Sequence, residues 1–177
     1  MSTLSWPRDL PVADGTLRRA RPDDAEALAA LMAEPDVDQW WHQAWPAPRW
    51  AAHLADLTRH GSLPLVLTEG RTVMGYAEVY VVADDVLGDH VDHLDRDLGV
   101  HLALSEAARG RGLGPALLSA LRGAAGGLLE GCLRLLAEPD ERNTRSHAAF
   151  RKAGFETAGT VRLPDKTALL VVAEVTR

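Results

Sequence analysis

The stretch from residue 98 to residue 155 constrains the fold most, and its centre is the hexapeptide Arg109-Gly110-Arg111-Gly112-Leu113-Gly114. In residues 98–105, leucine and valine occupy every second position, which predicts a strand with one apolar face. From Gly112 to Leu129, apolar residues recur three or four apart, which predicts a helix with one buried face. Several backbone N–H groups between this strand and helix have no carbonyl partners. Because glycine lets an anion approach them closely, the sequence predicts a phosphate-binding pocket.

The spacing of the glycines narrows the choice of ligand. A dinucleotide fingerprint needs glycine at the sixth position, where this chain has Pro115, and the Gly-Lys-Ser/Thr triplet of a nucleotide-binding loop does not occur. The pattern Arg/Gln-x-x-Gly-x-Gly/Ala is met by Arg109, Gly112 and Gly114. It resembles the pyrophosphate loop of the GNAT N-acetyltransferases, which bind acyl-coenzyme A (acyl-CoA). Taken alone, the hexapeptide also suits a simple glycine-rich helix cap.

The following segment extends this resemblance. Residues 132–137 read as a buried strand, and a helix led by Asn143 ends at Ala153 before a capping glycine. The spacing Asn143-x-x-Ser146-x-x-x-Phe150 resembles the coenzyme-contacting helix of the same superfamily. Many relatives have a tyrosine in place of Phe150, and it protonates the leaving thiolate. A phenyl ring has no proton to give, so this role is vacant or reassigned.

The remaining pattern predicts a strand at 16–20, a helix from Pro22, a second helix from Pro48 to about His60, a hairpin of strands at 63–68 and 73–82, and a last strand at 168–175. The sheet is antiparallel until the glycine loop and then becomes parallel. The resemblance implies an α/β (α+β) GNAT fold, with a mixed central sheet of about seven strands flanked by helices. Two splayed central strands would form the acyl-CoA cleft. We expect a single domain over 1–177, with residues 1–15 flexible or forming an extra strand.

Charge and cysteine content exclude several classes of protein. The net charge of −6 argues against a nucleic-acid binder. Cys132 is the single cysteine, so it forms no internal disulfide and is expected in the core. The first residues contain no long apolar run, so we expect no signal peptide, no membrane contact and a cytoplasmic location.

His101 and Asp140 are the candidate catalytic residues. If the strand before the glycine loop splays from the strand after its helix, both side chains could face one cleft. A carboxylate bonded to an imidazole fixes its tautomer and raises its basicity, which suits removal of a proton from an attacking amine. A backbone N–H near Leu104 could hold the thioester carbonyl if the strand is bulged there. The alternative is that His101 is an ordinary polar residue on a strand.

Two other segments suggest an acceptor pocket. Trp40, Trp41 and Trp45 lie between prolines and are expected either to wall a ligand pocket or to belong to the core, where we place Trp50. Residues 83–97 contain six aspartates and two histidines. They match no calcium-loop spacing, so we favour a solvated acidic loop over a metal site. Carboxylates beside the cleft would favour a cationic acceptor, such as a diamine or a basic amino acid.

Three motifs sharpen the resemblance: Gly99-Val-His101-Leu, Glu138-Pro-Asp140-x-x-Asn143 and Leu163-Pro-Asp-Lys166. Together they resemble the siderophore-biosynthetic acyltransferases, which acylate the side-chain amine or hydroxylamine of lysine. The likeness runs from about Trp40 to the end of the chain, and this group usually has phenylalanine at position 150. It implies that His101 and Asp140 form the catalytic pair and that the product is an iron-binding hydroxamate.

The resemblance also implies the remaining site residues and partners. The co-substrate is acetyl-CoA or another acyl-CoA, the acceptor is a small amine or hydroxylamine, no metal or nucleic acid takes part, and the protein is a monomer or homodimer. The residues expected to contact the coenzyme are Leu104, Arg109, Gly110, Arg111, Gly112, Leu113, Gly114, Asn143 and Phe150. Those expected to contact the acceptor are Trp40, Trp41, Trp45, Glu78, Asp85 and Lys166.

Two alternatives stay open at this point. An aminoglycoside 6'-N-acetyltransferase would share the paired tryptophans and the Gly75-Tyr76-Ala77 strand. The acidic loop would suit its polycationic substrate equally well. A non-catalytic acyl-CoA sensor would keep the coenzyme pocket without the chemistry. The sequence fixes neither the length of the acyl chain nor the choice between lysine, ornithine and a diamine.

Overall fold

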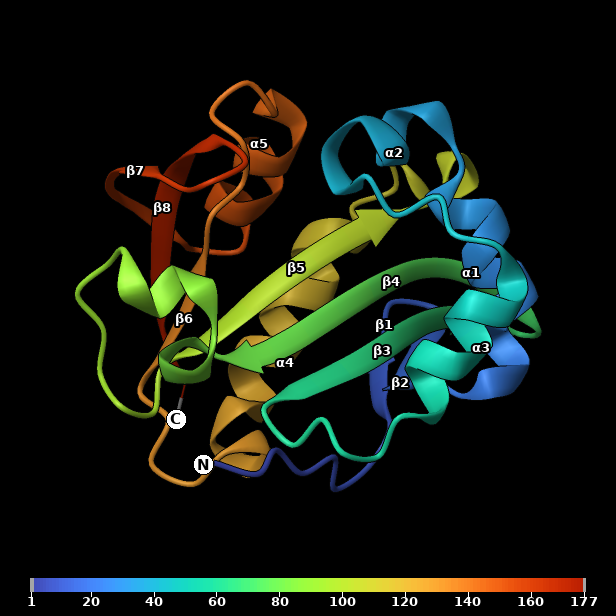
Figure 1. Ribbon diagram of the computed structural model, residues 1–177, viewed down its shortest axis with the longest axis horizontal. Helices are drawn as coiled ribbons and strands as arrows, with labels where there is room; N and C mark the ends of the chain where they lie inside the picture. The colour runs from blue at the N-terminus through green and yellow to red at the C-terminus, as the bar shows by residue number, and fades with distance from the viewer. Residues whose placement is uncertain (1, 177) are drawn as a thin grey trace.

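The computed structural model describes residues 2–176, which form an eight-stranded mixed sheet with five α-helices (Figure 1). The strands lie in the order β1-β2-β3-β4-β5-β6-β8-β7, and only the β5–β6 pairing is parallel. The strands are β1 Leu10–Val12, β2 Gly15–Arg19, β3 Ser62–Glu69, β4 Thr72–Val81, β5 Leu98–Leu104, β6 Arg134–Ala137, β7 Glu156–Arg162 and β8 Thr167–Glu174. The predicted mixed sheet is confirmed, with eight strands instead of about seven.

The helices are α1 Ala25–Met32, α2 Pro35–Trp41, α3 Ala47–Ala55, α4 Leu113–Leu128 and α5 Thr144–Lys152. The second predicted helix ends earlier than expected. Asp56 turns the chain there, because its carboxylate accepts hydrogen bonds from the Thr58 amide (2.9 Å) and hydroxyl (2.6 Å). No helix within residues 2–176 is long and apolar enough to cross a bilayer.

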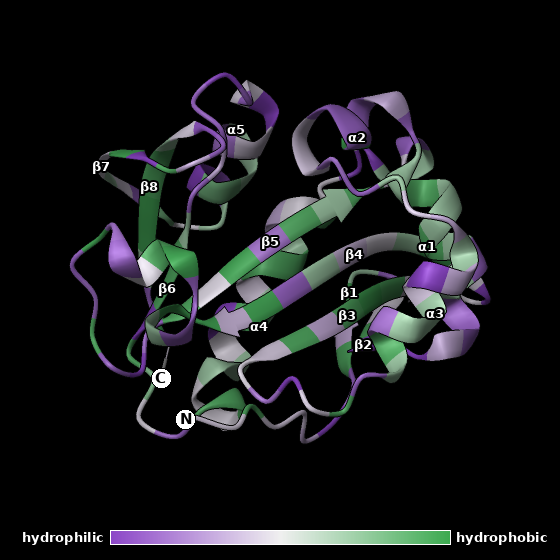
Figure 2. Ribbon diagram, in the orientation of Figure 1, coloured by the Kyte–Doolittle hydropathy of each residue, from purple (hydrophilic) through white to green (hydrophobic). Residues whose placement is uncertain are grey.

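The central strands β3, β4 and β5 are mostly buried, because apolar residues occupy both of their faces. Hydrophobic segments run along these strands in Figure 2. Leu65 and Leu67 of β3 share a core with the apolar face of α4, whereas Val66 packs with α1 and α3. Trp50 is completely buried in the second of these cores, and Cys132 is buried in the first, as expected.

The two central strands diverge, and this divergence positions the site. β4 and β5 pair along their whole length, from Val81 opposite Leu98 to Gly75 opposite Leu104. β5 and β6, in contrast, pair at only two positions, Leu98 with Leu135 and Gly99 with Leu136. From residue 100 onward, β5 therefore has no neighbouring strand on its β6 side, and α2 and α5 stand on either side of the opening (Figure 1).

The acidic segment 83–97 differs from the expected solvated loop. Two short 3-10 turns, Val82–Asp84 and Val86–Asp89, fold its first half against the sheet. At its end, Asp97 is completely buried and forms an ion pair with Arg134 at the start of β6. This segment is thus partly an element of the core where the two halves of the sheet meet.

Candidate active site

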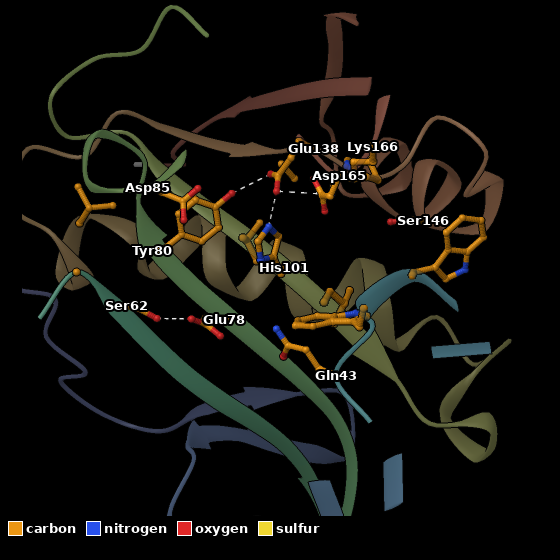
Figure 3. Close-up of a pocket in the computed structure, with 18 of the residues that line it drawn as sticks. Gln43, Ser62, Glu78, Tyr80, Asp85, His101, Glu138, Ser146, Asp165 and Lys166 are labelled. Atoms are coloured by element: carbon orange, nitrogen blue, oxygen red, sulfur yellow. Dashed lines mark hydrogen bonds and ion pairs between the residues drawn. The ribbon is translucent and has the colours of Figure 1, made fainter. Parts of the chain in front are cut away.

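A cavity of about 740 Å³ lies between the diverging strands β5 and β6 (Figure 3). Side chains from both halves of the sheet and from α2 and α5 line it. They include Trp40, Trp41, Ser62, Glu78, Tyr80, Asp85, His101, Glu138, Asp140, Asn143, Ser146, Phe150, Asp165 and Lys166.

His101 projects from β5 into this cavity. Its ring lies between two aromatic side chains, with centroids 4.8 Å from Tyr80 and 5.8 Å from Trp41. The edge-on contact with Trp41 and the contact with Tyr80 hold the imidazole plane in place. Its Nε2 bonds to Oε1 of Glu138, which directly follows β6. The pair therefore bridges the two strands where they separate.

Glu138 is a buried carboxylate with three partners. Besides His101, it accepts a hydrogen bond of 2.8 Å from the Tyr80 hydroxyl, and Nζ of Lys166 lies 3.8 Å away. Burial alone would raise the pKa of Glu138, but His101, Lys166 and Tyr80 lower it to about 2. Because the carboxylate is ionised, it must accept the bond from Nε2–H, which leaves Nδ1 as the basic nitrogen of the neutral ring.

Burial also acts on His101, where it lowers the pKa, but the negative charge and hydrogen bond of Glu138 outweigh it. The pKa of His101 is therefore raised above its usual value. The imidazole is a stronger base than a free histidine, as a group that removes a proton from an amine needs to be.

The prediction that Asp140 is the carboxylate bonded to His101 is wrong, because Glu138 takes that place. Asp140 faces the same cavity, but Arg142 holds its carboxylate through two bonds of 2.9 and 2.8 Å. That guanidinium lowers the pKa of Asp140 to about 2. The physical reason is position: Glu138 follows the last residue of β6 and reaches across to β5, whereas Asp140 lies in the turn beyond it.

Glu78 lies directly opposite His101 in the pairing of β4 with β5. Its carboxylate accepts hydrogen bonds from the Ser62 hydroxyl and, at 2.9 Å, from the Tyr76 hydroxyl. Arg59 lies 3.9 Å from the same group. Nearby, burial raises the pKa of Asp85, whose carboxylate also accepts the Leu87 amide.

Five of the six residues expected to contact an acceptor line this cavity, namely Trp40, Trp41, Glu78, Asp85 and Lys166. Trp45 does not, and that expectation is not met. Its ring packs 4.9 Å from Trp50, and Arg49 stacks on it at 4.1 Å. The chain turns at Pro46 into α3, which directs Trp45 towards that helix and away from the cleft.

A second cavity, of about 290 Å³, adjoins the first on the side of the glycine loop. Leu104, Arg109, Gly114 and Asn143 line it, and these were expected to contact the coenzyme. Trp40, Trp41, Leu102, Asn143 and Ser146 line both cavities, so the two spaces meet between α2 and α5. Phe150 lines the larger cavity, packed at 5.0 Å against Phe155.

The glycine loop has the free donors that a phosphate needs. Within residues 2–176, the amides of 110 to 114 donate to no backbone carbonyl. Gly112 precedes α4 with a φ of 73°, and a Cβ there would meet no heavy atom within 4 Å. The loop arginines are already paired: Arg109 with Glu34 (2.9 Å) and Asp36 (3.0 Å), and Arg111 with Glu69 (2.7 Å). The amides and the helix N-terminus thus supply the uncommitted positive potential.

The bulge that was considered as one possibility near Leu104 is absent, because the β4–β5 register runs without a shift. The Leu104 amide is nevertheless directed to the cleft. The Ser105 amide donates to the Met74 carbonyl, and successive residues of a strand point their amides to opposite sides. Leu102 and Leu104 therefore turn their N–H groups away from β4, towards the side where β6 has diverged.

Sequence reasoning missed Glu138 and Tyr80 as partners of His101, although Glu138 lies in one of the quoted motifs and Tyr80 in a predicted strand. The available signal was position along the chain: Tyr80 is two residues from Glu78 on the same face of β4, and Glu138 directly follows β6. No group of three or more His, Cys, Asp or Glu side chains in the described part of the chain converges as a metal site would.

A family model described as an acetyltransferase (GNAT) domain matches residues 21–163. Lysine N-acyltransferase MbtK of Mycobacterium tuberculosis is 37% identical over 145 residues, which cover 81% of this chain and 69% of that protein. N-hydroxyputrescine acetyltransferase of Acinetobacter baumannii is 29% identical over 84% of this chain and 72% of its own length. Among solved structures, an uncharacterized protein of Bacillus halodurans superposes with a TM-score of 0.82 at 27% identity, covering 98% of this chain and 92% of that one.

Proposed function

Because the chain belongs to the GNAT acetyltransferase family and is an N-acyltransferase, we propose that it acylates the side-chain amine or hydroxylamine of lysine, ornithine or a related diamine in hydroxamate siderophore biosynthesis. The observation that carries this proposal is the His101–Glu138 pair, set in a small polar cavity that opens onto the glycine loop. The relatives named for lysine and N-hydroxyputrescine support the same class of acceptor.

The co-substrate is an acyl-CoA, whose thioester supplies the acyl group. The free amides of residues 110–114 and the start of α4 suit its pyrophosphate, since they offer unpaired donors and room for close approach. Asn143 and Leu104 lie between this loop and the larger cavity, along the path that the rest of the coenzyme would take. The Leu104 amide, turned to the cleft, suits the thioester carbonyl oxygen as that oxygen gains negative charge.

His101 acts as the general base. Its Nδ1 removes the proton from the attacking nitrogen, and Glu138 stabilises the imidazolium that forms. Glu138 is thus a positioning residue that fixes the tautomer through Nε2. The acyl group passes directly to the acceptor, so no covalent acyl-enzyme is required.

The charges around the cavity favour an acceptor with a positive group. Its lining contains the carboxylates of Glu78, Asp84, Asp85 and Asp165, besides the paired Glu138 and Asp140, against the cations Arg59 and Lys166. A volume of about 740 Å³ suits an extended amino acid or diamine together with the acyl group.

Release of the coenzyme thiol from acetyl-CoA tests this proposal. The acceptors are N-hydroxylysine, N-hydroxyornithine, N-hydroxycadaverine, their parent amines and kanamycin, and each product is tested for iron(III)-hydroxamate colour. We expect thiol release and colour with one of the hydroxylamines. Release with kanamycin alone would instead assign the protein to aminoglycoside modification, and no release with acetyl-CoA or longer acyl-CoAs would support a binding protein.

A further inference from the structure

Neither His101 nor Phe150 can supply the hydrogen-bond donor that the leaving sulfur of the co-substrate needs. When the C–S bond breaks, the sulfur leaves as a thiolate, and a donor aimed at it lowers the barrier. His101 cannot serve in the same step, because it is taking up the proton of the acceptor nitrogen. Phe150 faces the cavity with a ring that has no exchangeable proton.

The sulfur must lie where the coenzyme side meets the acceptor side, since it is bonded both to the coenzyme and to the acyl carbon that the acceptor attacks. Five residues line both cavities, and Ser146 is the one among them that carries a hydroxyl. Asn143, also shared, uses its side-chain oxygen to accept the Ser146 amide at 3.1 Å and cap α5.

Ser146 lies in the first turn of α5 and lines both cavities (Figure 3). Its hydroxyl forms no hydrogen bond with any side chain or backbone group of residues 2–176, whereas His101 and the Tyr80 hydroxyl are both bonded to Glu138. Phe150 follows one helical turn later on the same face of α5, and it also lines the larger cavity.

From this geometry we propose that Ser146 is a further catalytic residue, whose hydroxyl donates to the leaving sulfur and relays a proton to it. The inference rests on the proposed acyl transfer. The N–C bond forms, the C–S bond breaks, and the nitrogen's proton goes to His101. Ser146 gives its proton to the sulfur while taking one from water in the open cleft, so the serine is unchanged after each turnover. The imidazolium then returns its proton to solvent.

The test compares two acyl donors that differ in the leaving thiol. Acetyl-CoA releases the coenzyme as a basic alkyl thiolate. S-(4-nitrophenyl) thioacetate releases a stable aryl thiolate, which needs little assistance from a hydrogen-bond donor. We expect Ser146→Ala to lower kcat with acetyl-CoA at least tenfold, and to change the rate with the aryl thioester by less than about twofold. Ser146→Thr should retain most of the activity, because it keeps the hydroxyl.

Two further variants separate a chemical role from a structural one. Ser119→Ala removes a hydroxyl from the exposed face of α4 and should match the wild type. Phe150→Tyr, added to Ser146→Ala, places a phenol one turn away and should restore part of kcat with acetyl-CoA. Equal losses with both donors, or no loss with either, would overturn the role of Ser146. A wild type that releases thiol with no acceptor would instead overturn the proposed function, and this inference with it.

Discussion

At the scale of single residues, the basicity of His101 depends on which carboxylate bonds to its ring. Glu138 and Asp140 both face the cavity, but Glu138 bonds the imidazole and Asp140 is held by Arg142. The two arrangements differ in their effect on the proton affinity of His101. The charge of Glu138 and its hydrogen bond to the ring, with a smaller contribution from the charge of Glu78, raise the pKa of the imidazole against the opposing effect of burial.

Glu138→Gln should therefore move the pH profile of activity. The base works when it is unprotonated, so activity falls as the pH drops below the pKa of His101. In the wild type this acid limb should lie above pH 6.5, the ordinary value for histidine, because Glu138 raises the pKa. Replacing Glu138 by a neutral amide removes the largest contribution that opposes burial, so the limb should shift to lower pH, with a lower plateau.

Asp140→Asn is the matched control, because it neutralises a second carboxylate in the same cavity. Since Asp140 is bonded to Arg142, this change should leave the acid limb where it is in the wild type. A shift with Asp140→Asn and none with Glu138→Gln would show that the pairing described above is not the working one.

At the scale of elements, the glycine loop and α4 give a prediction about coenzyme binding. Gly112 has a φ of 73°, a conformation in which a residue with a side chain is strained by about 1–2 kcal/mol. Gly112→Ala should raise the KM for acyl-CoA about tenfold and leave the KM for the acceptor nearly unchanged. Steady-state kinetics with each substrate varied in turn would measure both, and an equal rise in the two would argue against a phosphate role for this loop.

Gly126 provides a contrasting substitution in the same helix. It lies exposed within α4, and a Cβ there would meet no heavy atom within 4 Å. Gly126→Ala should raise the free energy of unfolding by about 0.5–1 kcal/mol, because alanine restricts the unfolded chain and favours the helix. Urea denaturation would measure the change, and kinetics should be unaffected.

The sequence predicts best those elements in which apolar residues recur at regular intervals. The alternation in β5 and the apolar face of α4 define their bounds to within about one residue, since each buries one side against the other. β7 was not recognised, because it lies at the sheet edge and Val161 is its single buried residue. The β4–β5 neighbours of His101 follow from register, which no local pattern in the sequence specifies.

At the scale of the whole molecule, two half-sheets meet at a short parallel contact. β5 and β6 pair at only two positions, so other contacts must hold the halves together. The pair of Asp97 with Arg134 is one of them, since it joins the residue before β5 to the first residue of β6. The cleft therefore exists because the fold limits strand pairing to its base.

Asp97→Asn should destabilise the whole protein. Asp97 is completely buried, and its carboxylate accepts hydrogen bonds from two nitrogens of Arg134. The substitution removes this negative charge and leaves the partly buried guanidinium without its counter-ion. Breaking such a pair costs about 3 kcal/mol of unfolding free energy. Thermal denaturation followed by circular dichroism would measure it. An unchanged melting temperature would mean that the contact does not hold the half-sheets together.

The role of His101 as the base is tested by comparing wild type and His101→Ala with N-hydroxylysine and with lysine, using thiol release from acetyl-CoA. A lysine amine, with a pKa of about 10.4, must lose a proton before it attacks, whereas a hydroxylamine is largely neutral at pH 7. We predict that His101→Ala loses activity about a hundredfold or more with lysine and distinctly less with N-hydroxylysine. Wild-type rates in the variant, or equal losses with the two acceptors, would contradict the assignment of His101 as the base.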